Sequence, residues 1–350
     1  MSNTVINPYN FVVGNVGAWK ELGRTTLLAE ADLISVTGLP NKRYYMLQYV
    51  LPKVSPANTR WTFNTTTGNE YSSRTTNNGS ADSTNVNGVN FHTHADTNGF
   101  NYGVSYISNL STEEKLAQFN ETGELGGVGS APDRCETVGK WDNTSNSISS
   151  IQLKNTDTGG FDTGSELVVL GFDPTDTHTT ADNFWQELAS VNWTSGSSID
   201  SGTFTAKKYL WVQIVFNTGT MSGSYSGLQV GNATIDTGTS YAFRYSEDGG
   251  ADSSQASKTN AWGAVGIGSD SSNSLNISNN FIINNASNEK LGISHSVINR
   301  GDTGAGFAPY RVECVWKWTD TSNQINRIEV SSQAGSGNYT GGTMKVWGSD

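Results

Sequence analysis

The residues of this chain best suited to metal chemistry are His92, His94 and Asp96. Histidines two positions apart on a strand point to one face and could hold a metal ion together. No third histidine or cysteine lies nearby, and the second half of the chain, which repeats the first, lacks the motif. We therefore interpret this segment as a polar loop and predict no metal or other cofactor.

Three carboxylates, Asp157, Asp162 and Glu166, flank a glycine-rich turn and could supply oxygen ligands to calcium. The corresponding residues of the second half are Ala334, Tyr339 and Thr343. A calcium site shared by both halves is therefore excluded, and a site private to the first half stays the weaker alternative.

An arginine and a glutamate two residues apart occur twice, as Arg134 with Glu136 and as Arg311 with Glu313. Because alternate residues of a strand share a face, we predict a partly buried ion pair in each half. The glutamates could instead be glycosidase carboxylates, which act as a pair about 5–10 Å apart. Each half repeats only one such glutamate, so the structural interpretation is favoured.

Tryptophans are the other side chains with functional potential, because they stack on sugars as well as fill cores. Trp141 and Trp318 follow a lysine at matching places in the two halves, and we predict that both lie in the core. Trp61, Trp193 and Trp262 have no tryptophan at the matching place. They are therefore the candidates for an exposed glycan-binding surface.

The two halves are copies of one domain. Residues 131–171 match residues 308–348 without a gap, at a constant offset of 177 positions. A repeat this long indicates a duplicated domain of about 160 residues, because solenoid units run roughly 20–50 residues. Upstream matches pair Trp19, Lys42, Tyr71, Arg74 and Asp82 with Trp185, Lys207, Tyr241, Arg244 and Asp252.

The composition excludes several classes of partner. Charged residues make up 15% of the chain, against about 25% in typical soluble domains, while aromatic residues make up 10%. Disordered chains combine high charge with few aromatics, so this mixture indicates strands joined by uncharged loops. The net charge of −11 and the lack of a Lys/Arg cluster argue against nucleic acid and anionic membrane surfaces as partners.

The cysteines and the N-terminus indicate a reducing compartment. Cys135 and Cys314 do not occupy equivalent positions of the repeat, so we predict two buried free thiols rather than symmetric disulfides. One bridge between the domains is the alternative. No signal peptide is visible, and we expect the protein to be made and kept in the cytoplasm, or exported without a recognisable signal.

Strand patterns dominate both copies. The runs 43–51 and 209–216 are almost entirely aromatic and apolar, which fits strands buried on both faces. Gly, Asn, Asp and Ser clusters separate such runs at intervals near ten residues, as in sandwiches and barrels. About eight strands per copy favour an all-β protein of two tandem, jelly-roll-like antiparallel β-sandwiches.

The repeat also predicts the domain boundaries. We expect a first sandwich at 18–172, a polar linker at 173–182 and a second sandwich at 183–350. Residues 1–17 belong to neither copy and form an N-terminal arm.

The arm carries apolar side chains at Pro8, Tyr9, Phe11, Val12 and Val13. A free terminus is usually polar, so an apolar one indicates a docking partner. We predict that these residues bind a neighbouring subunit or a particle surface. Folding back onto the first domain is the alternative.

Several strings resemble a family of structural proteins common in tailed phages of aquatic bacteria. The resemblance is carried by residues 19–26, 34–44, 79–82, 131–145 and 161–166, and it covers most of both copies. It implies a β-sandwich virion component and carries no catalytic residues. The second copy departs where Gly139 becomes Trp316 and Phe161 becomes Asn338, so a surface role tied to those positions would differ between the copies.

The leading functional hypothesis is a noncatalytic virion structural protein that is not an enzyme. Within that class we expect a capsid decoration or cement protein, or a tail-associated fibre or receptor-binding protein. We expect it to form a homo-oligomer, to bind other capsid or tail subunits and to contact a host surface glycan. A duplicated domain suits such contacts because it presents two similar surfaces. Alternatives are a carbohydrate-binding module, a double-jelly-roll capsid protein and, least favoured, a glycoside hydrolase or lyase.

Overall fold

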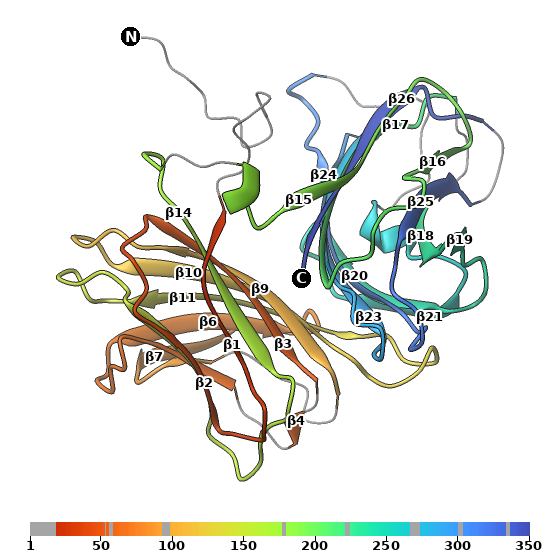
Figure 1. The fold of residues 1–350 in the computed structure, drawn as a ribbon. Helices are drawn as coiled ribbons and strands as arrows, with labels where there is room; N and C mark the ends of the chain where they lie inside the picture. The colour runs from red at the N-terminus through yellow and green to blue at the C-terminus, as the bar shows by residue number, and fades with distance from the viewer. Residues whose placement is uncertain are drawn as a thin grey trace.

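In the computed structural model, the chain forms two β-sandwich domains, each made of an eight-stranded and a four-stranded antiparallel sheet (Figure 1). The structure describes residues 19–52, 54–55, 59–92, 99–176, 180–220, 225–266, 274–299, 304–333 and 337–350. The predicted fold class of two tandem jelly-roll-like sandwiches is confirmed.

The first domain contains the following strands. Its eight-stranded sheet runs in the order β1 (Lys20–Thr26), β14 (Glu166–Phe172), β3 (Tyr44–Leu51), β9 (Asn101–Ser108), β10 (Lys115–Gly123), β11 (Asp133–Trp141), β6 (Tyr71–Asn77) and β7 (Ser83–Gly88). Its four-stranded sheet runs in the order β2 (Leu33–Thr37), β12 (Ser150–Asn155), β5 (Thr59–Phe63) and β8 (Phe91–His92), beside the small pair β4 (Val54–Ser55) and β13 (Gly160–Phe161).

The second domain repeats this arrangement. Its eight-stranded sheet runs in the order β15 (Gln186–Trp193), β26 (Gly341–Ser349), β17 (Tyr209–Asn217), β22 (Leu275–Ile283), β23 (Lys290–Ile298), β24 (Tyr310–Trp318), β20 (Tyr241–Glu247) and β21 (Ser253–Lys258). Its four-stranded sheet runs in the order β16 (Ser198–Asp200), β25 (Arg327–Ser332), β18 (Ser226–Asn232) and β19 (Thr234–Ile235). Two 3₁₀ turns complete the elements, η1 (Thr180–Asp182) and η2 (Trp262–Ala264).

The duplication reaches the level of strand register. In both domains the first and last strands pair antiparallel, and a bulge interrupts that pairing at the same place, at Glu21/Gly23 and at Glu187/Ala189. Bulges bend a strand locally and persist as features of a fold. The eight-stranded sheets of the two copies thus share one strand order, as predicted, and the four-stranded sheets share their first three strands. The fourth strand differs, because β8 follows β7 in the first domain whereas β19 precedes β20 in the second.

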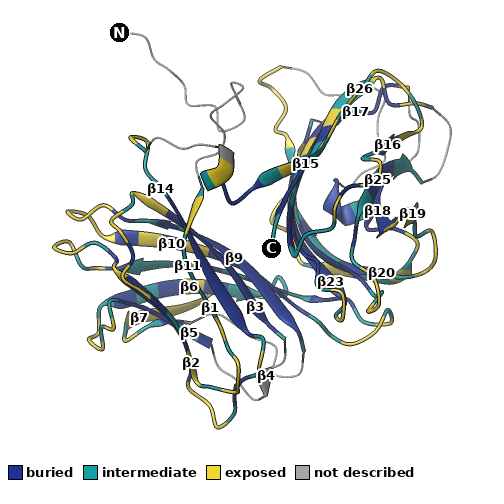
Figure 2. Ribbon diagram, in the orientation of Figure 1, coloured by how far each residue is buried: buried dark blue, intermediate teal, exposed yellow. Residues whose placement is uncertain are grey.

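Strand β3 explains why its sequence reads as buried on both faces. Tyr45, Leu47 and Tyr49 point into the core of the first domain. Met46 and Val50 point the other way, into an apolar cluster shared with the second domain. Figure 2 shows the central strands of this sheet as buried, although no second sheet of the same domain covers that side.

The repeated tryptophans lie at equivalent core positions, as predicted. Trp141 and Trp318 are both buried, and each indole nitrogen donates a hydrogen bond to a carboxylate, Glu70 at 2.7 Å and Asp236 at 2.8 Å. A buried indole N–H needs such a partner.

A buried lysine accompanies each of these tryptophans. The ammonium groups of Lys115 and Lys290 lie 5.6 Å from the ring centres of Trp141 and Trp318. Each ammonium donates three hydrogen bonds to backbone carbonyls of the adjacent turns. Burial lowers the pKa of Lys290 to about 8. The same lysine therefore ties together the same two turns in both domains.

In each of the two departures between the copies, the large side chain lies in the core, while Gly139 is half-buried and Asn338 is exposed. Gly139 leaves room for Phe91, because an added Cβ would lie 2.4 Å from that ring. In the second domain Trp316 fills this region and lies over Gly292, where a Cβ would lie 2.2 Å from the indole. Phe161 is also buried. At the Gly139 and Trp316 position, the large ring of each domain is thus matched by a glycine at its contact.

Cys135 and Cys314 are free thiols, and both are buried. Burial raises the pKa of the Cys314 thiol well above its ordinary value. The prediction of buried free cysteines is confirmed.

We expect Trp141→Ala and Trp318→Ala each to lower the free energy of unfolding by roughly 3–5 kcal/mol, the range for a truncated core tryptophan. Trp141→Phe keeps most of the apolar contact and loses the hydrogen bond to Glu70, so it should cost less. Urea denaturation followed by fluorescence measures the three values. A loss below about 1 kcal/mol for either alanine variant would contradict the core assignment.

Candidate binding surface

The two domains meet through the outer faces of their eight-stranded sheets, meaning the faces turned away from their own four-stranded sheets (Figure 1). An apolar cluster lies at this contact. The first domain contributes Met46, Val50, Phe100, Tyr102, Val104, Val168 and Leu170. The second domain contributes Phe184, Trp185, Tyr209, Phe281, Ile283, Leu291, Ile293, Val315 and Trp347. A contact this apolar resembles a domain core and holds the two sandwiches together.

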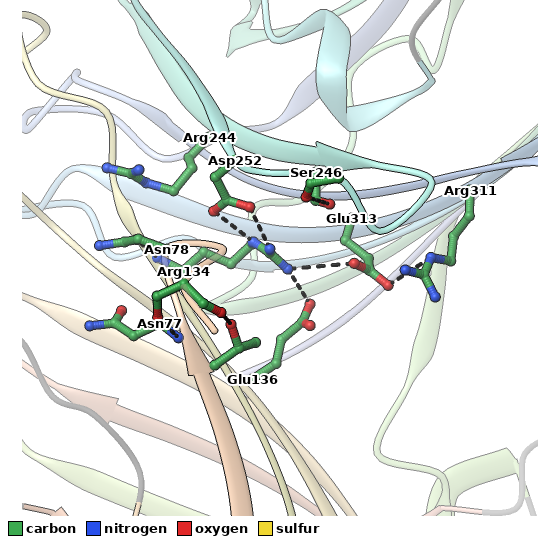
Figure 3. A network of polar contacts seen from close by, with 12 residues as sticks. Asn77, Asn78, Arg134, Glu136, Arg244, Ser246, Asp252, Arg311 and Glu313 are labelled. Atoms are coloured by element: carbon green, nitrogen blue, oxygen red, sulfur yellow. Dashed lines mark hydrogen bonds and ion pairs between the residues drawn. The ribbon is translucent and has the colours of Figure 1, made fainter. Parts of the chain in front are cut away.

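Arg134 on β11 joins the domains at the centre of a charged cluster (Figure 3). Its Nη2 lies 2.5 Å from Asp252 Oδ1 of the second domain, and its Nε donates to Oδ2 at 3.1 Å. Its Nη1 donates to Glu136 Oε1 at 2.7 Å and lies 3.6 Å from Glu313 Oε2. The predicted pairs are confirmed, since Arg311 Nε also lies 3.1 Å from Glu313. The bidentate pair with Asp252 was not predicted.

The cluster keeps its charges by mutual compensation. Burial acts against the charge of Arg134, but its hydrogen bonds to Asp252 and the nearby Glu136 and Glu313 outweigh that effect and raise its pKa. Burial and the neighbouring Glu136 raise the pKa of Glu313, although Arg311 and Arg134 act in the opposite direction. Removing the central guanidinium would therefore leave several carboxylates facing one another.

Glu166 forms a second polar contact between the domains. It accepts hydrogen bonds from Tyr209 at 2.6 Å and Lys208 at 2.9 Å, and also from Thr26 of its own domain at 2.6 Å. Burial favours its neutral form, but these hydrogen bonds outweigh burial and lower the pKa of Glu166. The carboxylate considered as a calcium ligand thus has a role at the interface, and no group of three or more potential ligands gathers among the described residues.

A loop between β10 and β11 closes the far edge of the interface. Lys317 donates to the carbonyl of Leu125 at 2.6 Å and lies 2.8 Å from Glu289. The amide of Gly127 donates to the same glutamate at 3.0 Å. Lys317 and Glu289 are both buried, so this charge pair is enclosed by the loop of the other domain.

The rest of the first domain's outer face is an open, apolar groove of about 1050 Å³. Tyr44 and Phe172 stack in it at 6.1 Å between ring centres, and Trp19 lies 6.0 Å from Phe172. Leu116 and Val138 on β10 and β11 are exposed on its floor. An exposed apolar patch with aromatic side chains and a polar rim marks a binding surface.

The tryptophans proposed for glycan binding are placed differently from this groove. Trp61 is fully buried between Tyr49 and Phe119, so the prediction that it is exposed is wrong. Trp193 and Trp262 are half-buried and pack against the core of the second domain. None of the three lines the groove.

The remaining candidates fall partly or wholly outside the described residues. The arm residues Pro8, Tyr9, Phe11, Val12 and Val13 lie outside them.

His92 ends strand β8, and His94 and Asp96 lie outside the described residues. The aromatics of the groove, Trp19, Tyr44 and Phe172, were missed as site residues. The sequence did hold a sign of this surface. Tyr44 begins a strand that is apolar on both faces, and the outer face of such a strand needs a partner.

The two glutamates considered as glycosidase carboxylates do converge on Arg134, but they do not line a groove. Nη1 of Arg134 lies 2.7 Å from Glu136 and 3.6 Å from Glu313, so the two carboxylates share the guanidinium.

Comparison with known proteins gives no assignment. No family model matches the chain, and no curated protein matches it. Similar solved structures include domains LG4–5 of the mouse laminin alpha1 chain, with 9% identity, 96% of this chain and 89% of that chain covered, and a TM-score of 0.17. Another is Neisserial surface protein A, with 9% identity, 87% and 97% coverage, and a TM-score of 0.10. TM-scores this low carry no argument.

One further observation concerns membranes. Among the described residues, no helix has the length and apolar character needed to span a bilayer.

We expect Arg134→Met to destabilise the protein by roughly 3–5 kcal/mol, because it leaves the buried Asp252 and its neighbours without a counter-charge. Arg311→Met is the matched control, because this equivalent arginine is mostly exposed and should change stability by about 0.5 kcal/mol or less. Urea denaturation at neutral pH and low protein concentration measures both. Equal losses for the two variants would contradict a special role for Arg134.

Proposed function

We propose that the protein is a noncatalytic structural component of a virion, either a capsid decoration or cement protein or a tail-associated fibre or receptor-binding protein. The observation that carries the proposal is the apolar half of the first domain's outer face, which is open beside an interface that holds the two domains together. Such a face serves binding to another surface. The resemblance of the repeated strings to tailed-phage structural proteins supports the virion setting.

The polar clusters favour a structural role over catalysis. Arg134, Glu166 and Lys317 each hold the domains together through partners on the opposite domain. The converging glutamates both pair with the guanidinium of Arg134. These three charged side chains are thus used between the domains, while the open groove is mostly apolar.

The virion assignment is tested on particles purified by density gradient from the source culture. An antiserum against the full chain should label the particles in immunogold electron microscopy and detect a band of 37.5 kDa in their protein. Antiserum absorbed with the purified chain is the control. Particles that carry neither label nor band would refute the proposal.

A carbohydrate-binding role is the second candidate, favoured by the aromatic side chains Trp19, Tyr44 and Phe172 in the groove. Aromatic faces stack on the apolar faces of sugar rings. The counterpart of Tyr44 in the second domain is Tyr209, which is buried at the interface. Only one domain therefore presents such a platform, which makes this role weaker than the structural one.

On a glycan array, we expect any glycan retained by the groove to lose at least about tenfold in affinity with Tyr44→Ala, the loss of one strong stacking contact. Tyr225→Ala, at an exposed tyrosine of the second domain outside the groove, is the matched control and should bind like the wild type. No retained glycan, or equal losses for both variants, would contradict this candidate.

A further inference from the structure

The duplicated domains use different halves of the same outer face in their contact. The first domain contributes the half with Val50 and Tyr102, whose equivalents in the second domain are Val215 and Ile277. The second domain contributes the opposite half, with Tyr209, Leu291 and Val315. Leu170 and its equivalent Trp347 both lie in the contact, so a strip of each face is used by both domains. Beyond this strip each domain keeps one half of its face free, and each free half is the copy of a half that the partner domain uses.

We propose that a second copy of this chain occupies these free surfaces, by packing the free half of its second domain onto the free half of the first domain. The contact between molecules would repeat the contact already made within the chain. The proposal goes beyond the proposed function, since it depends on the duplicated interface and not on a virion setting.

The free half of the first domain has the apolar residues that this contact needs. Leu116 is 58% exposed, whereas its equivalent Leu291 is 0% exposed at the interface. Val138 is likewise exposed, and its equivalent Val315 is buried there. Tyr44, the equivalent of the buried Tyr209, is the third exposed member of this half. An aliphatic or aromatic side chain is thus kept at these three positions. At two other covered positions, Ile283 and Ile293, the first domain carries the polar Ser108 and Gln118.

The free half of the second domain shows the same relation. Ile277 is 40% exposed, whereas its equivalent Tyr102 is 0% exposed at the interface. Val297 is also exposed beside it, on the neighbouring strand β23. Together with Leu275, which begins strand β22, these residues form a second exposed apolar strip. Solvent-facing positions of a sheet normally carry polar residues, so both strips indicate missing partners.

The charged contact has a free counterpart on each domain. Arg311 is the equivalent of Arg134 and its side chain is 58% exposed. Asp82 is the equivalent of Asp252, and it is exposed on the first domain. In the repeated contact, Arg311 of one molecule would pair with Asp82 of the next, as Arg134 pairs with Asp252.

Two further polar contacts of the interface have free equivalents. In the first of them, Arg244 Nε of the second domain donates to the carbonyl of Pro132 of the first domain at 3.0 Å. The equivalent residues are Arg74 of the first domain and Pro309 of the second, which would form this hydrogen bond between molecules.

The enclosed pair Lys317–Glu289 corresponds to Lys140–Glu114, which is an exposed ion pair of 2.9 Å on the free half of the first domain. In the first domain this pair is not covered by a loop in the way that Lys317 and Glu289 are. The free halves thus carry counterparts of three apolar contact residues, of the Arg134–Asp252 pair and of the Lys317–Glu289 pair. The interdomain hydrogen bonds of Glu166 have no counterpart, because the equivalent residue is Thr343.

Such a contact is head-to-tail, because it joins two different surfaces of the chain. Repeated head-to-tail contacts close into a ring when the rotation between subunits permits and otherwise extend as a filament. Either assembly leaves both free halves covered, which removes the exposed apolar area.

Sedimentation velocity of the full chain over a concentration series tests the proposal. The wild type should show species of twice 37.5 kDa or more in equilibrium with monomer. Leu116→Glu and Val297→Glu place a charge on one free half each, and each should shift association to at least about tenfold higher concentration. Leu28→Glu is the control, because Leu28 is highly exposed in the loop between β1 and β2 and does not line the groove. Far-UV circular dichroism checks that the variants are folded.

Mixing the two variants distinguishes a head-to-tail contact from a symmetric one. Leu116→Glu keeps the free half of its second domain, and Val297→Glu keeps the free half of its first domain. Their mixture should form a 1:1 complex and stop there, because only one intact pair of surfaces remains. The charge exchange Arg311→Asp with Asp82→Arg in one chain should restore association that each change alone weakens.

A wild type that stays monomeric throughout the series would overturn the proposal. So would an oligomer that Leu116→Glu destroys while Val297→Glu leaves it intact, since that result indicates a symmetric contact between first domains. Labelled virions together with a strictly monomeric chain would refute this inference alone. Association without any label on particles would refute only the virion assignment.

Discussion

The arrangement of the two domains depends on compensating one buried charge, the guanidinium of Arg134. A buried charge is costly without a partner, and here the principal partner, Asp252, is supplied by the other domain. The separated domains would expose this arginine and the apolar cluster around Tyr102 and Leu291 together. Apolar burial provides the driving force for docking, while the bidentate pair selects one orientation of the sheets. The open groove exists because that orientation covers only half of the first domain's outer face.

Much of the fold could be predicted from the sequence because duplication samples each position twice. A residue kept in both copies, such as Trp141 with Trp318, is constrained by the fold, and both proved to be core residues. Unmatched residues misled the prediction. Trp61 was assigned to the surface because the second copy has no tryptophan there, yet register places it opposite Leu153, as Leu228 lies opposite Val330. The position conserves apolar character and burial rather than residue type, which was the signal available.

The binding surface was harder to predict, for a physical reason. The equivalent arginines Arg134 and Arg311 have the same strand position and the same neighbouring glutamate, yet one is buried and the other is exposed. The difference arises from how one sheet lies on the other, and local sequence does not encode that choice. Tyr44 and Tyr209 are separated by the same asymmetry. A duplicated sequence therefore predicts the interacting surfaces as a set, but not which member of each pair is occupied.

The exchange between Phe91 over Gly139 and Trp316 over Gly292 also affects how the chain avoids misfolding. Tandem domains of similar sequence can trade strands during folding, which produces misassembled states. Here a strand carrying Trp316 would collide with Phe91 in the first core, and a strand carrying Gly139 would leave a void in the second. The cores have diverged until their segments no longer substitute for one another. The strands of each copy can thus pair within their own domain while the rest of the chain is still being synthesised.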